Sequence, residues 1–166
     1  MSKTKKLIVT FLFIHLTCYL SYSQSWESSA EIRRLRPTGI TANLGSTSIL
    51  VGGTISRYVS PALEANFSFG VGYFTTSFAA GANYHLTGNN RWSPYIGGNI
   101  MIYEDLDIFS DSKETMYSVY TPVGIQYFGP EGFTIGLEVG PMIDLGTSEF
   151  LSNTWGGIMI GYRFKN

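Results

Sequence analysis

Cysteine, histidine and charge are all scarce in this chain. It has one cysteine and two histidines among 166 residues, and charged residues make up only 14%, against about a quarter in an ordinary soluble domain. The one cysteine, Cys18, lies in an apolar stretch near the N-terminus. Residues 24–166 therefore contain neither a disulfide nor a thiolate metal site, and they hold too few charges to cover a large water-facing surface.

A long hydrophobic run is missing after residue 23. Before it, three lysines within the first six residues precede an apolar run over residues 7–20 and a small-x-small triplet at 21–23. This order is typical of a secretory signal peptide, whereas a membrane-anchoring helix needs about 20 apolar residues and this run is interrupted by His15. We predict that residues 1–23 are removed. If the remaining chain enters a membrane, it does so with strands.

Basic residues are few as well. Without its first 23 residues the chain keeps eight basic residues against twelve acidic ones, a net charge of −4. Binding to phosphate backbones needs a basic face, and none is visible in the sequence. Nucleic acid is therefore excluded as an expected partner.

Large apolar residues alternate with small or polar ones through most of the chain. In residues 62–73 one face holds Leu63, Ala65, Phe67, Phe69, Val71 and Tyr73, and the other holds Glu64, Asn66, Ser68, Gly70 and Gly72. A period of two predicts a strand with one apolar face. The same pattern is clear in 77–86 and 133–145, and it is weaker in 38–44, 49–58, 94–103 and 117–127. The terminal segment 157–164 adds one more strand. We therefore expect about eight strands, each about ten residues long, the length of transmembrane strands.

The second face of these strands consists of glycine, serine, threonine, asparagine and scattered charges, which suits the interior of a narrow barrel better than a solvent surface. The predicted fold is an all-β, closed, antiparallel up-and-down transmembrane β-barrel over residues 37–166. A short periplasmic segment, 24–36, precedes it, and both termini are periplasmic. The face assignment of 49–58 is ambiguous because Arg57 shares the parity of the apolar Val51 and Ile55.

Two prolines and the aromatic residues add detail. Pro122 and Pro141 lie inside expected strands, where each removes a ladder hydrogen bond, so we predict bulges or strand ends there. Aromatic residues gather near both ends of the expected strands, as in interfacial girdles. Those expected near the short turns are Tyr58, Tyr84, Tyr95, Tyr127, Phe133, Tyr162 and Phe164, and those near the longer links include Tyr73, Tyr103 and Tyr117.

A polar network is expected in the lumen. Glu138 and Arg163 face inward on neighbouring strands, and a last loop centred near Glu149 would bring them within reach of a salt bridge. The other candidate members are Glu64, Asn66, Asn99 and Gln126. A narrow lumen must satisfy its own charges, so we expect this network to be structural, with a proton or ion path as the alternative.

Two further features invite a chemical role. His85 is a candidate catalytic base, but spacing brings neither a nucleophile nor an orienting carboxylate to it, so no catalytic residues and no enzyme activity are predicted. The acidic segment 104–115 lacks the glycine of a calcium loop, so we expect a surface loop that contacts an extracellular partner or lipopolysaccharide. No metal or cofactor is predicted.

The C-terminal strand carries a family resemblance. Ile158, Ile160, Tyr162 and Phe164 alternate with small or polar residues, which resembles the insertion signal of outer-membrane barrels, although Lys165 and Asn166 follow the aromatic residue. The whole chain resembles the small OmpA- and OmpX-like barrels. Segments such as "WSPYIGGNI" and "TPVGIQYFGPEGFTIGLEVGP" are similar to the porin-like β-barrel domain of Bacteroidetes. The resemblance implies an outer-membrane location and insertion by the barrel assembly machinery.

Several functions remain open. The leading expectation is a small outer-membrane barrel with a structural or surface-interaction role and a lumen filled by side chains. A secreted, lipocalin-like barrel that binds an apolar ligand would need its large residues to point inward. A narrow channel and a lipid-modifying enzyme are the remaining alternatives.

Overall fold

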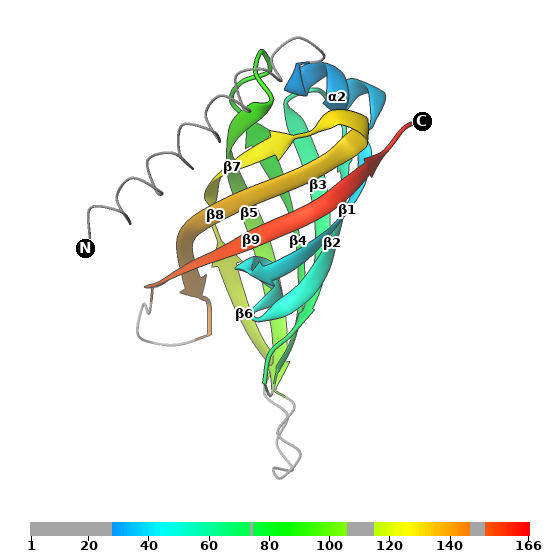
Figure 1. Cartoon of the computed structure of the whole chain (residues 1–166). Helices are drawn as coiled ribbons and strands as arrows, with labels where there is room; N and C mark the ends of the chain where they lie inside the picture. The colour runs from blue at the N-terminus through cyan, green and yellow to red at the C-terminus, as the bar shows by residue number, and fades with distance from the viewer. Residues whose placement is uncertain (1–27, 74, 106–114, 147–151) are drawn as a thin grey trace, which may run out of the picture.

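In the computed structural model, which describes residues 28–73, 75–105, 115–146 and 152–166, one antiparallel sheet closes on itself (Figure 1). Neighbouring strands along the chain pair with each other, except that β6 and β7 both pair with β5 on one side and with β8 on the other, and the last strand pairs with the first. The strands are β1 (Thr38–Gly45), β2 (Val51–Tyr58), β3 (Leu63–Val71), β4 (Thr75–His85), β5 (Trp92–Asp105), β6 (Thr115–Tyr120), β7 (Val123–Phe128), β8 (Phe133–Asp144) and β9 (Ser152–Phe164). The predicted closed up-and-down barrel is confirmed.

Strands β6 and β7 are two parts of one span, so the nine strands form eight spans. The register along β5 continues across the interruption, because Asn99 lies opposite Tyr120 and Ile96 lies opposite Val123. Two residues on β5 therefore face the two intervening residues. No residue is inserted, so the interruption is not a bulge.

The two prolines lie at this interruption. Gly97 donates its N–H to the Pro122 carbonyl at 2.8 Å, and Thr121 donates to the Pro141 carbonyl at 3.1 Å. Neither proline has an N–H with which to return the bond. Pro122 ends a strand segment as expected, but the expectation for Pro141 was wrong, since β8 continues through it. The backbone nitrogen of Pro141, which has no N–H to donate, faces the interruption beside Pro122. One break in the hydrogen-bond ladder therefore accommodates both prolines.

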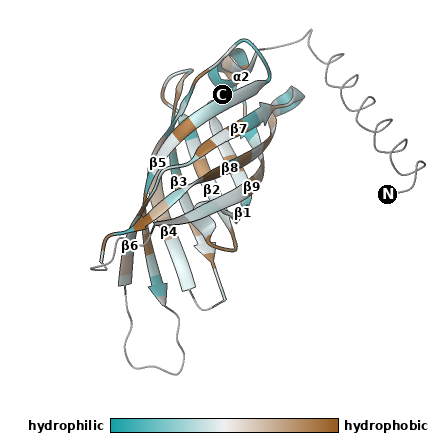
Figure 2. Ribbon diagram, turned by 90° about the vertical axis from the view of Figure 1, so that its left-hand side faces the viewer, coloured by the Kyte–Doolittle hydropathy of each residue, from teal (hydrophilic) through white to brown (hydrophobic). Residues whose placement is uncertain are grey.

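The large apolar side chains point away from the barrel axis. Phe67, Phe69 and Leu137 have half of their surface exposed, whereas Ser68 is buried between the first two along β3. Short hydrophobic and hydrophilic stretches alternate along the strands (Figure 2). In β2, Val51, Ile55 and Arg57 face outward and Tyr58 faces inward, which settles the ambiguous face of 49–58. The expected girdle was partly wrong. Tyr58, Tyr95 and Tyr103 are buried inside the barrel, because they occupy positions of their strands whose side chains face the lumen.

The helix α2 (Ser29–Leu35) covers one end of the barrel, where the C-terminus also lies (Figure 1). Its Ile32 and Arg33 side chains are buried. Two backbone bonds connect the helix to the β4–β5 turn, from Ser29 to the Asn90 carbonyl and from Ala30 to the Gly88 carbonyl. We call this the termini end. Three short turns lie there, β2–β3, β4–β5 and β7–β8, the last containing the 3₁₀ turn η2 (Pro130–Gly132).

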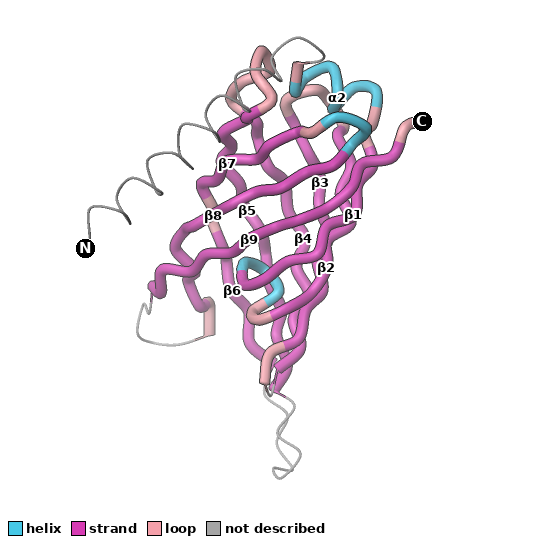
Figure 3. Tube along the Cα trace, in the orientation of Figure 1, coloured by secondary structure: helices cyan, strands magenta, loops and turns pink. Residues whose placement is uncertain are grey.

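At the opposite end, the loop end, the β1–β2 connection folds inward. It forms the 3₁₀ turn η1 (Ser46–Ser48), whose three residues are all buried (Figure 3). Gly70 and Gly157 leave the room it needs, because a Cβ on Gly70 would collide with Ser48 and one on Gly157 would lie 2.6 Å from the Ser46 nitrogen. Within the described residues, no helix is long and apolar enough to cross a bilayer.

Candidate functional site: the polar lumen

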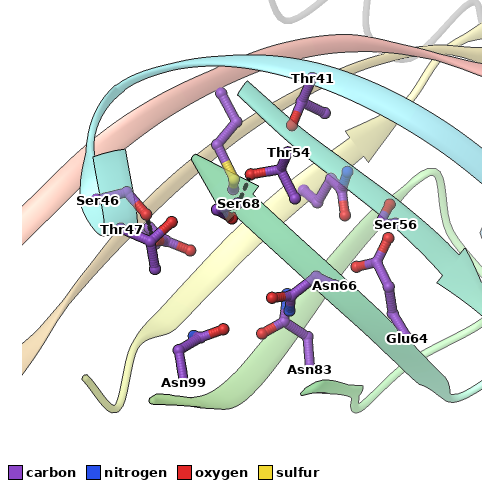
Figure 4. Close-up of a pocket in the computed structure, with 13 residues that line it drawn as sticks. Thr41, Ser46, Thr47, Thr54, Ser56, Glu64, Asn66, Ser68, Asn83 and Asn99 are labelled. Atoms are coloured by element: carbon purple, nitrogen blue, oxygen red, sulfur yellow. Dashed lines mark hydrogen bonds between the residues drawn. The ribbon is translucent and has the colours of Figure 1, made fainter. Parts of the chain in front are cut away.

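The inward-facing side chains nearly fill the barrel. They leave a cavity of about 30 Å³, lined by serine, threonine, asparagine and glutamate side chains (Figure 4). A cavity of this size and polarity holds one or two water molecules. An apolar ligand would find neither the space nor the apolar walls that it needs.

Near the termini end, Glu64 lies at the centre of a charged cluster. Its carboxylate accepts a hydrogen bond from Arg163 Nη1 at 2.7 Å and lies 3.5 Å from His85 Nε2. The Arg163 guanidinium also donates to the Arg36 and Pro37 carbonyls and lies 4.1 Å from the centre of the Tyr58 ring. Both charged side chains are buried, and each has the partners that a buried charge requires.

Helix α2 adds a second arginine to this end. Arg33 donates to the Thr87 carbonyl at 2.7 Å and to the Ser93 hydroxyl at 3.4 Å, and it lies 5.5 Å from the centre of the Phe128 ring. Burial lowers the pKa of Arg33, but an arginine begins so far above neutral that it keeps its charge. The helix therefore closes the termini end with a cation held by hydroxyl, carbonyl and aromatic groups.

The expected salt bridge between Glu138 and Arg163 does not form. Glu138 lies opposite Gly157, and Phe133 lies opposite Tyr162, so Arg163 is six positions further along β9. At about 3.3 Å per residue that offset is about 20 Å along the strand. The prediction was wrong because it centred the β8–β9 loop near Glu149, and a small shift of that centre moves the partner by twice as much. Arg163 pairs instead with Glu64, across the barrel seam.

Glu138 holds the inward loop. Its carboxylate accepts hydrogen bonds from the Ser46 hydroxyl of η1 and from the Tyr95 hydroxyl at 2.5 Å. Trp155 donates to the Ser46 carbonyl at 2.8 Å, and Ser77 donates to the Thr47 carbonyl at 3.0 Å. Strands β4, β8 and β9 thus fix η1 inside the lumen.

Between the two ends, neutral polar groups form the lining. Asn43 donates to the Thr54 hydroxyl at 2.6 Å, and Thr54 shares a hydrogen bond with Ser68, also at 2.6 Å. Of the predicted network, Asn66, Asn99 and Gln126 line the same cavity as Glu64 and Glu138. The Oδ1 atoms of Asn83 and Asn99 are buried without a protein partner, which is where water would bind.

His85 has a different environment from the one expected. Its Nδ1 lies 3.1 Å from the Ser93 hydroxyl, while its Nε2 faces Glu64 and the Tyr58 hydroxyl. A hydroxyl, an imidazole and a carboxylate therefore do converge, contrary to the reading of their spacing. The β3–β4 and β4–β5 pairings bring these residues together from separate strands. The Ser93 side chain is fully buried, already donates to the Thr87 carbonyl and contacts Arg33. A substrate cannot reach it in this arrangement.

The remaining predicted residues are at the surface or outside the described residues. Ile158, Ile160, Tyr162 and Phe164 all face outward on β9, each more than two-fifths exposed. Most of the acidic segment 104–115 and all of residues 1–23 lie outside the described residues. At the loop end, Asp144 accepts hydrogen bonds from Tyr103 and Ser118. Among the described residues, no three histidine, aspartate or glutamate side chains gather as a metal site.

Comparison with known proteins supports the fold. No protein-family model and no curated protein matches the chain. The crystal structure of the N-terminal β-barrel domain of Pseudomonas aeruginosa OprF is similar, with a TM-score of 0.65 and 19% identity, over 78% of this chain and 98% of that one. The chain has the fold of that barrel. At this identity the likeness shows the fold alone, and both the OmpA/OmpX-like kind and the Bacteroidetes-type family stay predictions.

Two groups in the lumen were missed by sequence reasoning. Arg33 enters with α2, whose start is signalled by Ser28 followed three residues later by Glu31, the spacing of a helix N-cap. In the structure the Ser28 hydroxyl accepts a hydrogen bond from the Glu31 N–H. The sequence carries no comparable signal for Ser46 and the rest of η1. A loop rich in serine and threonine is normally expected to be exposed to solvent.

Proposed function

We propose that this protein is a small, non-enzymatic β-barrel of the bacterial outer membrane, with a structural or surface-interaction role and a lumen filled by its own side chains. The observation that carries the proposal is the inversion of polarity. Phenylalanine, leucine, isoleucine and valine side chains cover the outside of every span, whereas arginine, glutamate, asparagine and serine are buried inside. Water would not support such an outer surface, but acyl chains would.

Closure of the sheet supports the same conclusion. Every strand has a partner on both sides, because β1 pairs with β9 over eight residue pairs. In hydrocarbon each unpaired backbone group costs several kcal/mol, so a sheet can cross a bilayer only when it is closed. Helix α2 and the residues after β9 lie on the side of the short turns. The pattern of outer-membrane barrels would make that side periplasmic and the loop end extracellular.

The alternative functions have less support. The lipocalin-like alternative needs an apolar interior, but the interior is polar and its cavity measures about 30 Å³. A channel would need a continuous path past η1, the Glu64 cluster and α2. A lipid-modifying enzyme would need an accessible nucleophile, and Ser93 is sealed beneath Arg33.

The expected partners follow from this location. Outer-membrane lipid and lipopolysaccharide would surround the barrel, and the barrel assembly machinery would insert it, with Ile158, Ile160, Tyr162 and Phe164 as the insertion signal. The segment 104–115 connects β5 to β6 at the loop end, where an extracellular partner would meet it.

Membrane fractionation and a heat-modifiability gel test the proposal. The protein expressed from its full sequence should remain with the outer-membrane fraction after carbonate washing. Without boiling it should run at a different position from the boiled sample, because a closed barrel resists SDS. The purified protein should also insert into vesicles of neutral phosphatidylcholine. Recovery in the aqueous fraction without detergent would overturn the proposal and favour a secreted barrel.

A further inference from the structure

Charge is sorted along the barrel axis. All seven basic residues that the structure describes are at the termini end: Arg33, Arg34, Arg36, Arg57, Arg91, Arg163 and Lys165. Arg33 and Arg163 are buried, and the other five are exposed or partly exposed at the same end. We call these five residues the basic collar. Two exposed carboxylates, Glu31 and Glu131, share this end, so the collar keeps a net positive charge of three. Towards the loop end the described charges are acidic, as in Glu104, Glu138 and Asp144.

One member of the collar stands on the apolar outer face. Arg57 points outward from β2, and its neighbours on that face, Ile55 and Val59, are 53% and 64% exposed. The nearest residues across the strand pairings are Thr38 and Ala65, which carry no charge. Among the described residues no carboxylate forms an ion pair with Arg57. A cation in an apolar surface needs an anion or water.

The height of Arg57 on the barrel indicates which anion it meets. Arg57 lies opposite Thr38, and Thr38 lies opposite Phe164, so the arginine is level with the ends of the first and last strands. Exposed aromatic residues surround the same end: Tyr84, Trp92, Phe133, Tyr162 and Phe164. Aromatic side chains of this kind mark the headgroup level of a bilayer. An arginine extends towards that level and matches the geometry of a phosphate group.

We propose that Arg57, supported by the field of the collar, binds the phosphate of an anionic phospholipid in the leaflet at the termini end. This inference rests on the membrane-spanning function proposed above. The observations behind it are an unpaired arginine on an apolar face, the aromatic belt level with it, and the one-sided basic collar. The collar also gives the two leaflets different electrostatic preferences, because the acidic loop end would repel the same lipid.

Native mass spectrometry tests the proposal. Protein purified from membranes in a neutral detergent is mixed with equal amounts of phosphatidylglycerol and phosphatidylcholine. The quantity measured is the ratio of protein carrying one phosphatidylglycerol to protein carrying one phosphatidylcholine. The wild type should favour phosphatidylglycerol, and Arg57→Gln should lower the ratio about fivefold, the factor that corresponds to about 1 kcal/mol per basic residue at an anionic surface. Raising the salt from about 0.1 M to about 0.5 M should also reduce it.

Two matched variants separate the site from general charge. Glu104→Gln, at the loop end, should leave the ratio unchanged. Lys165→Gln, beyond the last strand, should lower it without touching the sheet, and it keeps the test valid if Arg57→Gln does not fold, as judged by heat modifiability. A wild-type ratio near one would overturn the inference, and so would a folded Arg57→Gln variant with the wild-type ratio. If Arg57→Gln does not fold, an unchanged ratio for Lys165→Gln would overturn it.

The vesicle experiment distinguishes the two proposals. If the protein inserts into neutral vesicles but shows no lipid preference, the collar has no lipid site and the membrane-spanning function stands. If it does not insert at all, both proposals fail.

Discussion

The buried pair of Glu64 and Arg163 offers the sharpest test of how the lumen is stabilised. Their contact is 2.7 Å long, and Glu64 and Arg163 are 4% and 1% exposed. Glu64→Gln removes the negative charge at nearly constant volume and leaves the arginine with the Arg36 and Pro37 carbonyls. Losing one partner of a buried ion pair costs about 3–5 kcal/mol. The remaining neutral acceptors solvate the guanidinium in part, so we expect Glu64→Gln to lower the free energy of unfolding by about 3 kcal/mol, the lower end of that range.

The measurement is equilibrium unfolding in urea with the protein in phosphatidylcholine vesicles. Glu138→Gln is the matched control, because that carboxylate accepts from the Ser46 and Tyr95 hydroxyls and has no cationic partner among the described residues. Glu138→Gln should lower the free energy of unfolding by about 1.5 kcal/mol, which is the scale of a neutral hydrogen bond.

A double variant isolates the pair itself. Glu64→Gln combined with Arg163→Met should destabilise by less than the sum of the two single changes, since neither charge is then left alone. If Glu64→Gln cost less than about 1 kcal/mol, or no more than the Glu138→Gln control, the reasoning about the charged cluster would be refuted.

Three further predictions concern the two ends of the barrel and its lumen. Arg33→Ala should release α2 from the barrel end, seen as faster amide exchange over residues 29–35 and faster trypsin cleavage at Arg34, while protection of the strands stays as in the wild type. Gly70→Val should prevent η1 from entering the lumen, because its Cβ would collide with Ser48; the heat-modifiable band should be lost, whereas Gly146→Val, in open space, should keep it. Planar bilayers with the wild-type protein should show no steady conductance, and well-resolved openings would contradict a lumen whose cavity is about 30 Å³.

The barrel itself could be predicted because its signal is local. Alternation in segments such as 62–73 shows which side chains share a face, and the 14% charge content shows that the apolar face is not balanced by a water-facing one. The outward positions of Phe67 and Leu137 follow directly from parity. Parity also places Glu64 and Arg163 inside, without saying how far along the axis each one lies.

The partners inside the lumen could not be predicted, because they depend on the axial register of the strands. An error of one or two residues in a loop centre leaves every face assignment intact but moves the partner across the lumen by several ångströms, and this separated Glu138 from Arg163. The convergence of Ser93, His85 and Glu64 requires three spans to be in the correct register at once. The inward turn η1 depends on glycines in strands far from it in sequence, such as Gly70 and Gly157.

The position of Arg163 ties the completion of the barrel to the end of its last described strand, β9. Its guanidinium binds the carbonyl of Arg36, 127 positions earlier, and the carboxylate of Glu64, 99 positions earlier. The acceptors are therefore synthesised well before the donor. A chain that stopped at Tyr162 would lack the side chain that joins β3 and the residues just before β1 to the final strand, and we expect such a chain to stall as an open sheet.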